Sequence, residues 1–462
     1  MGSRLTNVRE TIDGYTPIWK RSVRLASPIA VDKTLRTFMR TTDVIVTGLF
    51  SPAAIAAIGL ADLYARIPTK IGSGLGGGAI ALSSQETGSG NTANRDEALT
   101  QATLLAALLG IPLAIFGITS GEWAISVLGA PANVAQMGGA YLGIIFLTAP
   151  ARHVGYVATR AVQGTGNTKT PMKINMIANA INIVLTTSLG LGLGFAPRLE
   201  IVGVGIGTGV GNVFTALAFL WVVYVSEKLS FVRPSNPQLL RQLLAISWPK
   251  TLEGLSTTVA GFPFNSILLV FGVEVNAAWQ ASRRLYQQLT APPIRAGNTV
   301  SSIIIGQDIG GGDYGLARSN SWAIAILGVG LITPVGLLMA LNAEALVGVF
   351  TSDPETIRHG SYFTIAYGLS AGLEALYKIF TGVLQGAGET RKPLIAELTA
   401  VFGSLVVFNY VAGIYLGFGV TMAYFSIVLY NVWRFVLVLV WFSRDGWLVR
   451  AQDMMEAREA AG

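Results

Sequence analysis

The chain has 462 residues, of which 52% are hydrophobic and only 12% are charged. Soluble domains carry charge on roughly a quarter of their residues, and the mean hydropathy here is +0.55. These values exclude a soluble catalytic domain beside the apolar part. The net charge of +7 lies mostly in short polar gaps, which is typical of a membrane topology signal and argues against nucleic-acid binding.

The chain contains no cysteine and two histidines, His153 and His359. The absence of cysteine excludes disulfide scaffolds, iron–sulfur clusters, thiolate zinc sites and cysteine nucleophiles. Two histidines leave little choice of residue for a Ser-His-Asp triad. The first 24 residues are polar and basic and lack an apolar core before a small-residue cleavage site. We therefore expect no removable signal peptide.

Apolar stretches of membrane-spanning length recur along the chain, since a span needs about 20 apolar residues. Less pure segments lie at 24–50, 52–82, 137–163, 243–270, 273–305 and 360–384. Stretches without any charge lie at 98–119, 174–197, 201–226, 319–342 and 398–433. The last is long enough for two spans with a turn at Gly417, Phe418 and Gly419, and its second span extends beyond residue 434. The sequence thus predicts an all-α polytopic membrane protein with twelve transmembrane helices.

Basic residues cluster at the N-terminus and in alternate gaps between the predicted spans. They are Arg4, Arg9, Lys20, Arg21, Arg24, Arg95, Lys169, Lys228, Arg233, Arg318, Arg391, Lys392, Arg444 and Arg450. The other gaps are poor in basic residues, apart from Arg198 and Arg358. Because the number of helices is even, this distribution predicts a multi-pass protein of the cell membrane with both termini in the cytoplasm.

The two halves of the chain repeat each other. Residues 162–171 (VQGTGNTKTP) reappear 222 positions later as residues 384–393 (LQGAGETRKP). Other landmarks keep nearly the same offset: Pro28 and Pro249, Asp32 and Glu253, and Gln85 and Gln307. We predict a cytoplasmic segment at 1–20, an N-lobe of six helices at 21–226, a cytoplasmic linker at 227–241, a C-lobe of six helices at 242–446 and a cytoplasmic tail at 447–462.

Six helices per half bring both lobes into the membrane from the same side, so the repeat is parallel. Two pseudo-symmetric lobes around a central cavity predict a transporter that opens to alternate sides, which is a different architecture from a fixed pore. Duplication for stability alone is the alternative. Duplicated helical membrane folds mostly transport.

These motifs resemble the multidrug and toxic compound extrusion (MATE) family of secondary transporters, over about residues 21 to 444. The resemblance depends on the duplicated Q-G-x-G-[NE]-T-x-x-P turn, on TDVIVTG at 42–48 and on GQDIG at 306–310. It implies export of amphipathic, often cationic compounds from a central cavity. Inward flow of H⁺ or Na⁺ would drive this export while the two lobes rock.

Carboxylates within the predicted spans are candidates for ion coupling, because an unpaired charge there costs a few kcal/mol. Asp43 lies in an apolar segment and resembles the first-helix acid that the family uses in its N-lobe; a structural pairing with Arg40 is the alternative. Glu253 and Glu374 match acids that NorM-like members use in the C-lobe. Asp32, the repeat equivalent of Glu253, adjoins Lys33, and an ion pair with that lysine is the alternative to a coupling role.

A polar ladder in the fifth predicted helix adds to the resemblance. Asn175, Asn179 and Asn182 lie on one helix face, where amide oxygens can bind Na⁺ together with Asp43 or hold its proton. Hydrogen bonding between helices is an equal alternative. Thr186 stands where DinF-like members have a second acid, so the chain mixes DinF-like and NorM-like features. Thr208 is a further candidate ligand, and no cofactor or other metal is expected.

Charge within the spans bears on the substrate. Ten bases (Lys33, Arg36, Arg40, Arg66, Lys70, Lys250, Arg283, Arg284, Arg295 and Lys378) face five acids (Asp32, Asp43, Asp62, Glu253 and Glu374). If some of these bases line the cavity, an anionic or zwitterionic amphipath is favoured. The candidate cavity residues are Arg36, Arg40, Phe262, Phe264, Trp279, Arg283, Arg284 and Tyr286. Pro28 and Pro249 each remove a helix hydrogen bond and are candidates for gating bends, with a static kink as the alternative.

Two glycine-rich motifs resemble nucleotide-binding sequences but are explained without a bound nucleotide. Residues 164–170 resemble a phosphate loop but lack the glycine before the lysine and a preceding soluble strand, so ATP-driven transport is not supported. Residues 203–207 lie in an apolar span and predict close helix packing. The favoured function is ion-coupled export of a small amphipathic substrate by a monomer in contact with lipid. A flippase for lipid-linked or anionic substrates is the main alternative, and an intramembrane enzyme is the least supported.

Overall fold

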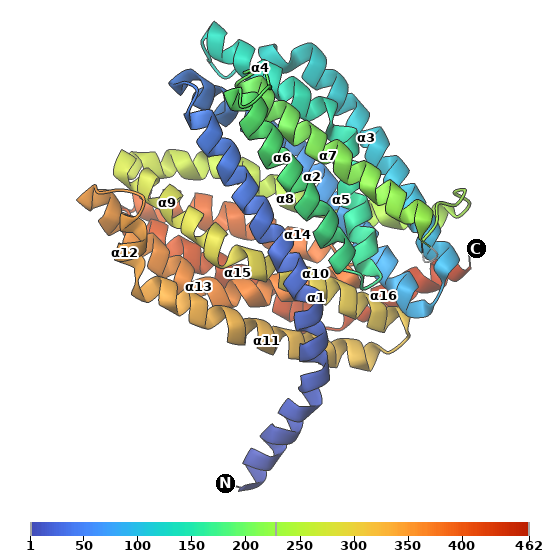
Figure 1. The fold of residues 1–462 in the computed structure, drawn as a ribbon. Coiled ribbons are helices and arrows are strands. Elements are labelled where there is room, and N and C mark those ends of the chain that lie inside the picture. The colour runs from blue at the N-terminus through green and yellow to red at the C-terminus, as the bar shows by residue number, and fades with distance from the viewer. Residues whose placement is uncertain (1, 227–228, 461–462) are drawn as a thin grey trace. The chain divides into compact units, whose positions relative to one another are not determined.

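The computed structural model describes residues 2–226 and 229–460, with side chains from residue 14 onward. Within these ranges the chain forms helices and no strand (Figure 1). The first half contains α1 (Gly2–Gly48), α2 (Pro52–Ser89), α3 (Thr92–Ser126), α4 (Ala132–Leu147), α5 (Ala149–Gly164), α6 (Lys169–Leu191) and α7 (Ile201–Val225). The polar segment predicted at 1–20 thus continues from residue 2 into the first long helix.

The second half follows the same plan. It contains α8 (Pro237–Phe271), α9 (Val273–Leu289), α10 (Ala291–Gly310), α11 (Tyr314–Leu341), α12 (Ala343–Gly348), α13 (Pro354–Gly386), α14 (Arg391–Ala400), the π-helical segments η1 (Val401–Val407) and η2 (Asn409–Tyr415), α15 (Thr421–Ser443) and α16 (Gly446–Glu459). Gly417 and Gly419 have φ of 75° and 72°, so the turn predicted between the last two spans is present. The predicted linker 227–241 lies partly outside the described residues; from residue 237 it is helical.

Seven of the described helices are long and apolar enough to cross a membrane: α3, α6, α7, α8, α11, the segment 391–415, and α15. An eighth is the pair α4 and α5, which is bent by 47° where Pro150 interrupts helix hydrogen bonding. The remaining predicted spans lie in α1, α2, α9 with α10, and α13, where charged or small residues lower the hydropathy. Each of the twelve predicted spans therefore has a helical counterpart.

The chain forms two compact units. The N-unit comprises residues 31–251 and 457–462, and the C-unit comprises residues 1–30 and 252–456. These units divide the chain at other residues than the lobes predicted from the repeat. The division falls within α1 and within α8. In α1 the C-unit holds residues 2–30 and the N-unit holds residues 31–48, whereas in α8 the N-unit holds residues 237–251 and the C-unit holds residues 252–271.

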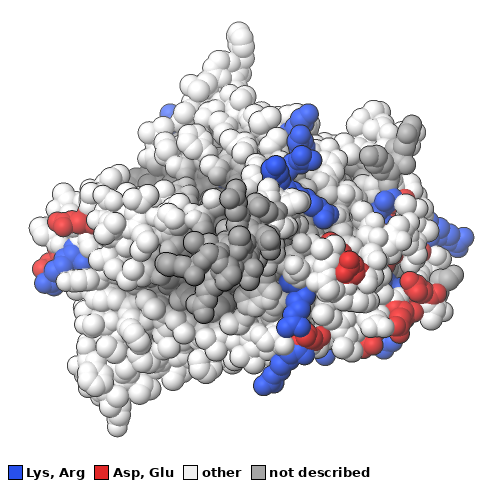
Figure 2. Space-filling model, turned by 90° about the horizontal axis from the view of Figure 1, so that it is seen from below, with Lys and Arg blue, Asp and Glu red and all other residues white. Residues whose placement is uncertain are grey.

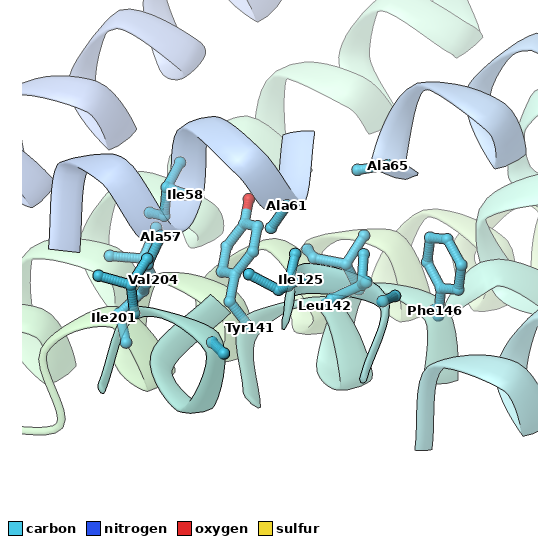
Figure 3. Packing of buried hydrophobic residues seen from close by; sticks show 14 of the residues in the cluster. Ala57, Ile58, Ala61, Ala65, Ile125, Tyr141, Leu142, Phe146, Ile201 and Val204 are labelled. Carbon is cyan, nitrogen blue, oxygen red and sulfur yellow. The ribbon is translucent and has the colours of Figure 1, made fainter. Parts of the chain in front are cut away.

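In the N-unit, α2 packs against α3, α4 and α5, and α6 lies side by side with α7 (Figure 1). Small residues of α2 such as Ala57 and Ala61 are fully buried against the large side chains of α4. In Figure 3 the ring of Tyr141 points toward the helix that carries Ile58 and Ala61. This alternation of small and large side chains brings the helices close together, as dispersion between helices in lipid requires.

In the C-unit, α13 is the central helix and packs against α9, α10, α11 and α15. The core of the C-unit includes Phe264, Leu268 and Trp279. The rings of Phe264 and Trp279 pack edge to face, with their centres 5.2 Å apart. Many apolar side chains of both units face outward, among them Ile118, Trp221 and Leu338. Much of the surface visible in Figure 2 carries neither basic nor acidic side chains, as expected for a surface that contacts lipid.

The two copies of the repeated turn are structurally alike. Gly166 and Gly388, 222 positions apart, both have left-handed backbone conformations, with φ of 86° and 80°. Asn167 and Glu389 also occupy equivalent positions, and each accepts a hydrogen bond from a backbone N–H at the start of the following helix. The duplicated motif therefore ends one helix and caps the next, which is a structural role.

A second repeated feature holds the terminal segments. Arg458 in the C-terminal helix forms an ion pair with Glu86 at 2.9 Å in the N-unit, and Gln85 accepts a hydrogen bond from it at 2.7 Å. Arg21 makes the corresponding contacts in the C-unit, with Gln307 at 2.5 Å and Asp308 at 3.9 Å. Equivalent glutamine–acid pairs at the ends of α2 and α10 thus bind arginines from opposite ends of the chain.

Candidate functional site

The N-unit brings together Asp43 and part of the predicted polar ladder. Thr186 of α6 donates a hydrogen bond to Asp43 Oδ1 at 3.3 Å, so the residue that replaces the second acid contacts the first. Asn182 Nδ2 donates to Thr208 Oγ1 of α7 at 3.0 Å. Asp43 forms no ion pair within the described part of the chain, so the alternative of a pairing with Arg40 finds no ion-pair contact.

Glycines of α7 allow this close approach. A Cβ atom at Gly203 would lie 2.6 Å from the backbone carbon of Leu189, and one at Gly207 would lie 2.6 Å from Thr186 Oγ1. These contacts confirm that the glycine run packs one helix against another. The same packing brings α6 and α7 close enough for the hydrogen bond between Asn182 and Thr208.

Two amide groups of the ladder retain unused hydrogen-bonding capacity. Asn182 is 2% exposed, and its Oδ1 has no hydrogen-bond partner among the described residues. Nδ2 of Asn179 also has no hydrogen-bond partner among them. A buried carbonyl-type oxygen suits Na⁺, and a carboxylate such as Asp43 suits Na⁺ or H⁺. Nδ2 of Asn179 is a hydrogen-bond donor, so it suits an acceptor oxygen atom better than a cation. Asn175 is also buried on this helix.

The C-unit places the predicted acid Glu374 in a different environment. Its carboxylate forms an ion pair with Arg434 of α15 and accepts a hydrogen bond from Tyr286 at 3.2 Å. Arg434 is 2% exposed and also forms an ion pair with Glu397 at 3.1 Å. Glu397 accepts a further hydrogen bond from Tyr377 at 2.8 Å. Two buried carboxylates therefore share one buried guanidinium group.

Sequence reasoning missed Arg434 and Glu397. A signal was present, since these two residues are the charges that bound the uncharged stretch 398–433. Glu397 lies 20 residues before Gly417 and Arg434 lies 15 residues after Gly419, so the turn brings both residues to the same end of a helical hairpin. The packing of α14 against α15 then sets their contact.

Glu253, the third predicted coupling acid, is buried and has a lysine partner. Lys378 Nζ lies 3.9 Å from Glu253 Oε1. Its repeat equivalent Asp32 lies 3.4 Å from Lys33 Nζ, so the ion pair considered for Asp32 and Lys33 is present. Of the three predicted coupling acids, only Asp43 lies without a basic partner within ion-pair distance in the described ranges.

The predicted aromatic residues of the C-unit separate into two groups. Trp279 donates a hydrogen bond to Tyr367 at 3.1 Å, Tyr286 stacks on Tyr367 at 5.2 Å, and Arg283 lies over the Trp279 ring. Tyr286 in turn donates a hydrogen bond to Glu374. Phe264 packs edge to face on Trp279 and so belongs to the same buried group, whereas Phe262 and Arg284 are exposed.

Both predicted kink prolines lie next to the division between the two units. Pro28 is buried in α1, three residues before the N-unit begins at Val31. Pro249 is buried in α8 just before the C-unit resumes at Leu252. Each proline thus removes a backbone hydrogen bond where a helix passes from one unit to the other.

Arg36, one of the predicted cavity bases, donates a hydrogen bond to Tyr156 Oη at 2.5 Å. Arg40 is exposed on the same helix. Two further bases lie on the helix of Tyr156, namely Arg152 and Arg160, which the count of bases within the spans omitted. The basic character of the N-unit is therefore stronger than that count indicated.

Two homologous sets of membrane-spanning helices, with polar side chains buried inside each set, define this chain as a helical membrane transporter. Residues 28–187 and 249–411 match the MatE family. The chain belongs to this family, and each matched segment begins at one of the two repeat-related prolines.

Curated relatives are similar over most of their length. The chain is 22% identical over 441 residues to the probable multidrug resistance protein NorM of Thermotoga maritima, covering 94% of both chains. It is 25% identical over 435 residues to the multidrug resistance protein NorM of Burkholderia vietnamiensis, covering 90% of this chain and 93% of the relative.

A solved structure shows the same fold. The chain superposes with a TM-score of 0.86 and 20% identity on a MOP superfamily transporter from Pyrococcus furiosus, covering 95% of this chain and 97% of the other. That protein is described as having a binding pocket of reverse polarity, which suggests a different function for it.

Proposed function

We propose that this chain is a secondary antiporter that exports small amphipathic or xenobiotic compounds in exchange for H⁺ or Na⁺. Multidrug resistance is the function named for the NorM relatives. Two homologous halves suit a rocking, alternating-access mechanism, in which Pro28 and Pro249 serve as bends. The protein acts as a monomer in the cell membrane, with both termini in the cytoplasm and with lipid around the two units.

The observation that carries this proposal is the environment of Asp43. It is a half-buried carboxylate with one hydrogen bond from Thr186 and no basic partner within ion-pair distance in the described part of the chain. Glu374 and Glu253, in contrast, lie within 4.0 Å of Arg434 or Lys378. A carboxylate without a fixed counter-charge can take up and release a cation, because neutralisation removes the cost of its burial.

Asn182 adds a neutral oxygen ligand to this proposal. Its Oδ1 is buried without a partner, and its amide is held in place by Thr208. Na⁺ would be held by Asp43 and Asn182, whereas a proton would need Asp43 alone. Replacement of external Na⁺ by a pH gradient therefore distinguishes the two coupling ions.

Transport in proteoliposomes tests the proposal. Efflux of ethidium and of 1-naphthyl phosphate, one cationic and one anionic aromatic compound, is driven by an imposed Na⁺ or pH gradient and is compared between the wild type, Asp43→Asn and the exposed control Glu122→Gln. We expect Asp43→Asn to lose gradient-driven transport and Glu122→Gln to retain it. Equal rates with and without gradients, unaffected by Asp43→Asn, would contradict coupled antiport.

The second candidate is a flippase for lipid-linked or other anionic amphipathic substrates. The bases around Tyr156 favour it, since a basic surface suits phosphate-bearing headgroups. A fluorescent phosphatidylglycerol and an ethidium assay on the same vesicles separate the two functions. Transfer of the lipid between leaflets without any gradient-driven ethidium efflux would favour the flippase.

A further inference from the structure

We propose that Arg36, Arg152 and Arg160, grouped around Tyr156 in the N-unit, bind the anionic group of the substrate. This inference rests on the transport function proposed above and specifies its substrate class. The substrate would be an amphipath that carries a carboxylate, sulfonate or phosphate. It would differ from the cationic compounds that the family resemblance implies.

Two helices supply this basic group. Arg152, Tyr156 and Arg160 follow each other at intervals of four residues and so lie on one face of α5. Lys33 and Arg36 lie three residues apart on one face of α1. The hydrogen bond from Arg36 to Tyr156 joins the two faces, with the guanidinium carbon 5.1 Å from the centre of the ring.

Bases outnumber acids among the described residues of this group: Lys33, Arg36, Arg152 and Arg160 accompany one carboxylate, that of Asp32. Asp32 lies within ion-pair distance of Lys33 at 3.4 Å, whereas neither Arg36 nor Arg152 forms an ion pair in the described ranges. Arg152 lies one helical turn before Tyr156 on the same face of α5. An unpaired base within a membrane span is energetically costly. An anion bound between these guanidinium groups would offset that cost.

Glycines of α2 leave room for the basic face of α5. A Cβ atom at Gly72 would lie 3.3 Å from the Tyr156 ring, and one at Gly76 would lie 2.8 Å from Arg160 Cγ. Gln163 accepts a hydrogen bond from Arg160 at 3.2 Å, which holds the guanidinium group. Tyr156 and Arg160 are thus seated against α2 by close packing, and their orientation on α5 is set by the fold.

The repeat shows that the fold itself does not require these bases. At the offset of 222, Arg152 corresponds to Glu374 and Arg160 to Gly382. At the offset of 221, Arg36 corresponds to Thr257. The C-unit forms the same helices with an acid or a neutral residue at each position. The bases therefore serve a purpose of the N-unit alone, and anion binding fits their chemistry.

Guanidinium groups suit anions with two or more oxygen atoms, because their planar fork can donate two hydrogen bonds to one group. The ring of Tyr156 adds an aromatic surface, and the surrounding helices are apolar. A compact anion such as inorganic phosphate would use the charges only. An aromatic anion would use the charges and the ring, so we expect it to bind more tightly.

Binding of matched probes tests the inference. The full chain in phosphatidylcholine nanodiscs is titrated by calorimetry with 1-naphthyl phosphate and with 1-naphthylmethylammonium, which share one ring system. We expect the phosphate to bind at least about tenfold more tightly, and Arg152→Gln to weaken its binding by about tenfold. Equal or tighter binding of the ammonium probe by the wild type would overturn the inference.

Two variants control for charge and for folding. Lys169→Gln removes a base at an exposed position of α6 and should leave phosphate binding unchanged. Arg152→Lys keeps the charge but not the planar fork, and it should restore only part of the affinity lost in Arg152→Gln. Wild-type affinity in folded Arg152→Gln and Arg36→Gln would contradict the site.

The source of the anion is resolved by lipid exchange. Phosphatidylglycerol in place of phosphatidylcholine should weaken binding of 1-naphthyl phosphate if a lipid headgroup occupies the site, and have no effect if the ligand is a free amphipath. Both results support an anion site. The binding titration uses no ion gradient and therefore does not depend on ion coupling. A protein that shows no ion coupling but still prefers the phosphate probe would contradict the proposed antiport only. Coupled ethidium transport without phosphate selectivity contradicts this inference only.

Discussion

Arg434 Nη1 of α15 lies 3.1 Å from Glu397 Oε2 of α14, and both side chains are almost fully buried in the C-unit. The guanidinium group also lies over the rings of Tyr377 and Tyr430, at 4.3 Å and 3.7 Å from their centres. Because Glu374 contacts the same arginine, three helices, α13, α14 and α15, are held by one cation. Removal of that cation would leave two buried carboxylates uncompensated.

We therefore expect Arg434→Leu to destabilise the protein by at least about 3–5 kcal/mol, the usual cost of breaking a buried ion pair. Glu397→Gln should cost less, because Glu374 still balances the arginine. Thermal unfolding in detergent, followed by intrinsic fluorescence, measures both effects. The exposed Arg444→Leu is the control. An unfolding midpoint of Arg434→Leu equal to that of Arg444→Leu would show that the network is not stabilising.

Gly207 is the point at which α7 approaches α6 near the proposed coupling site. Gly207→Ala would place a methyl group 2.6 Å from Thr186 Oγ1 and 2.8 Å from its backbone nitrogen. We expect a loss of about 1–3 kcal/mol of stability from overpacking, and reduced ion-driven transport because Asn182 and Thr208 move apart. Gly59→Ala is the control, since nothing lies within 4 Å of its added methyl. Unchanged stability and transport in Gly207→Ala would refute this packing argument.

Pro28 and Pro249 lie where α1 and α8 pass between units. Alanine restores the missing N–H donor, so Pro28→Ala and Pro249→Ala should not lower stability and can raise it by up to about 3 kcal/mol. We expect several-fold slower transport, because a bend becomes harder to form. Pro17→Ala in the same helix as Pro28, but away from the division between units, is the control. If all three variants transport at the wild-type rate, the prolines are static kinks.

The orientation in the membrane can be measured directly because the chain has no cysteine. Thr92→Cys lies at the start of α3 and Ala132→Cys at the start of α4, and both positions are exposed. The positive-inside rule places position 92 in the cytoplasm and position 132 outside. A membrane-impermeant maleimide added to intact cells should label only Ala132→Cys. The opposite labelling would reverse the proposed orientation.

Much of the fold is local information and is readable in the chain. A run of about 20 apolar residues predicts a span because the helix rises 1.5 Å per residue across a bilayer of fixed thickness. The offset of about 222 residues predicted two equivalent halves, and the matching turns at Gly166 and Gly388 follow from it. Asp43, Glu253 and Glu374 were found because carboxylates are rare in spans.

The tertiary structure decided which of these acids has a counter-charge. Arg434 lies 60 residues from Glu374 along the chain, and their contact depends on how α13 and α15 are rotated and packed. Hydropathy and spacing carry no such information, so the sequence ranked Glu374 with Asp43. The division of the units within α1 and α8 is likewise a property of packing. The sequence thus determined the helices, the repeat and the candidate charges, whereas contacts between helices decided which charges are paired.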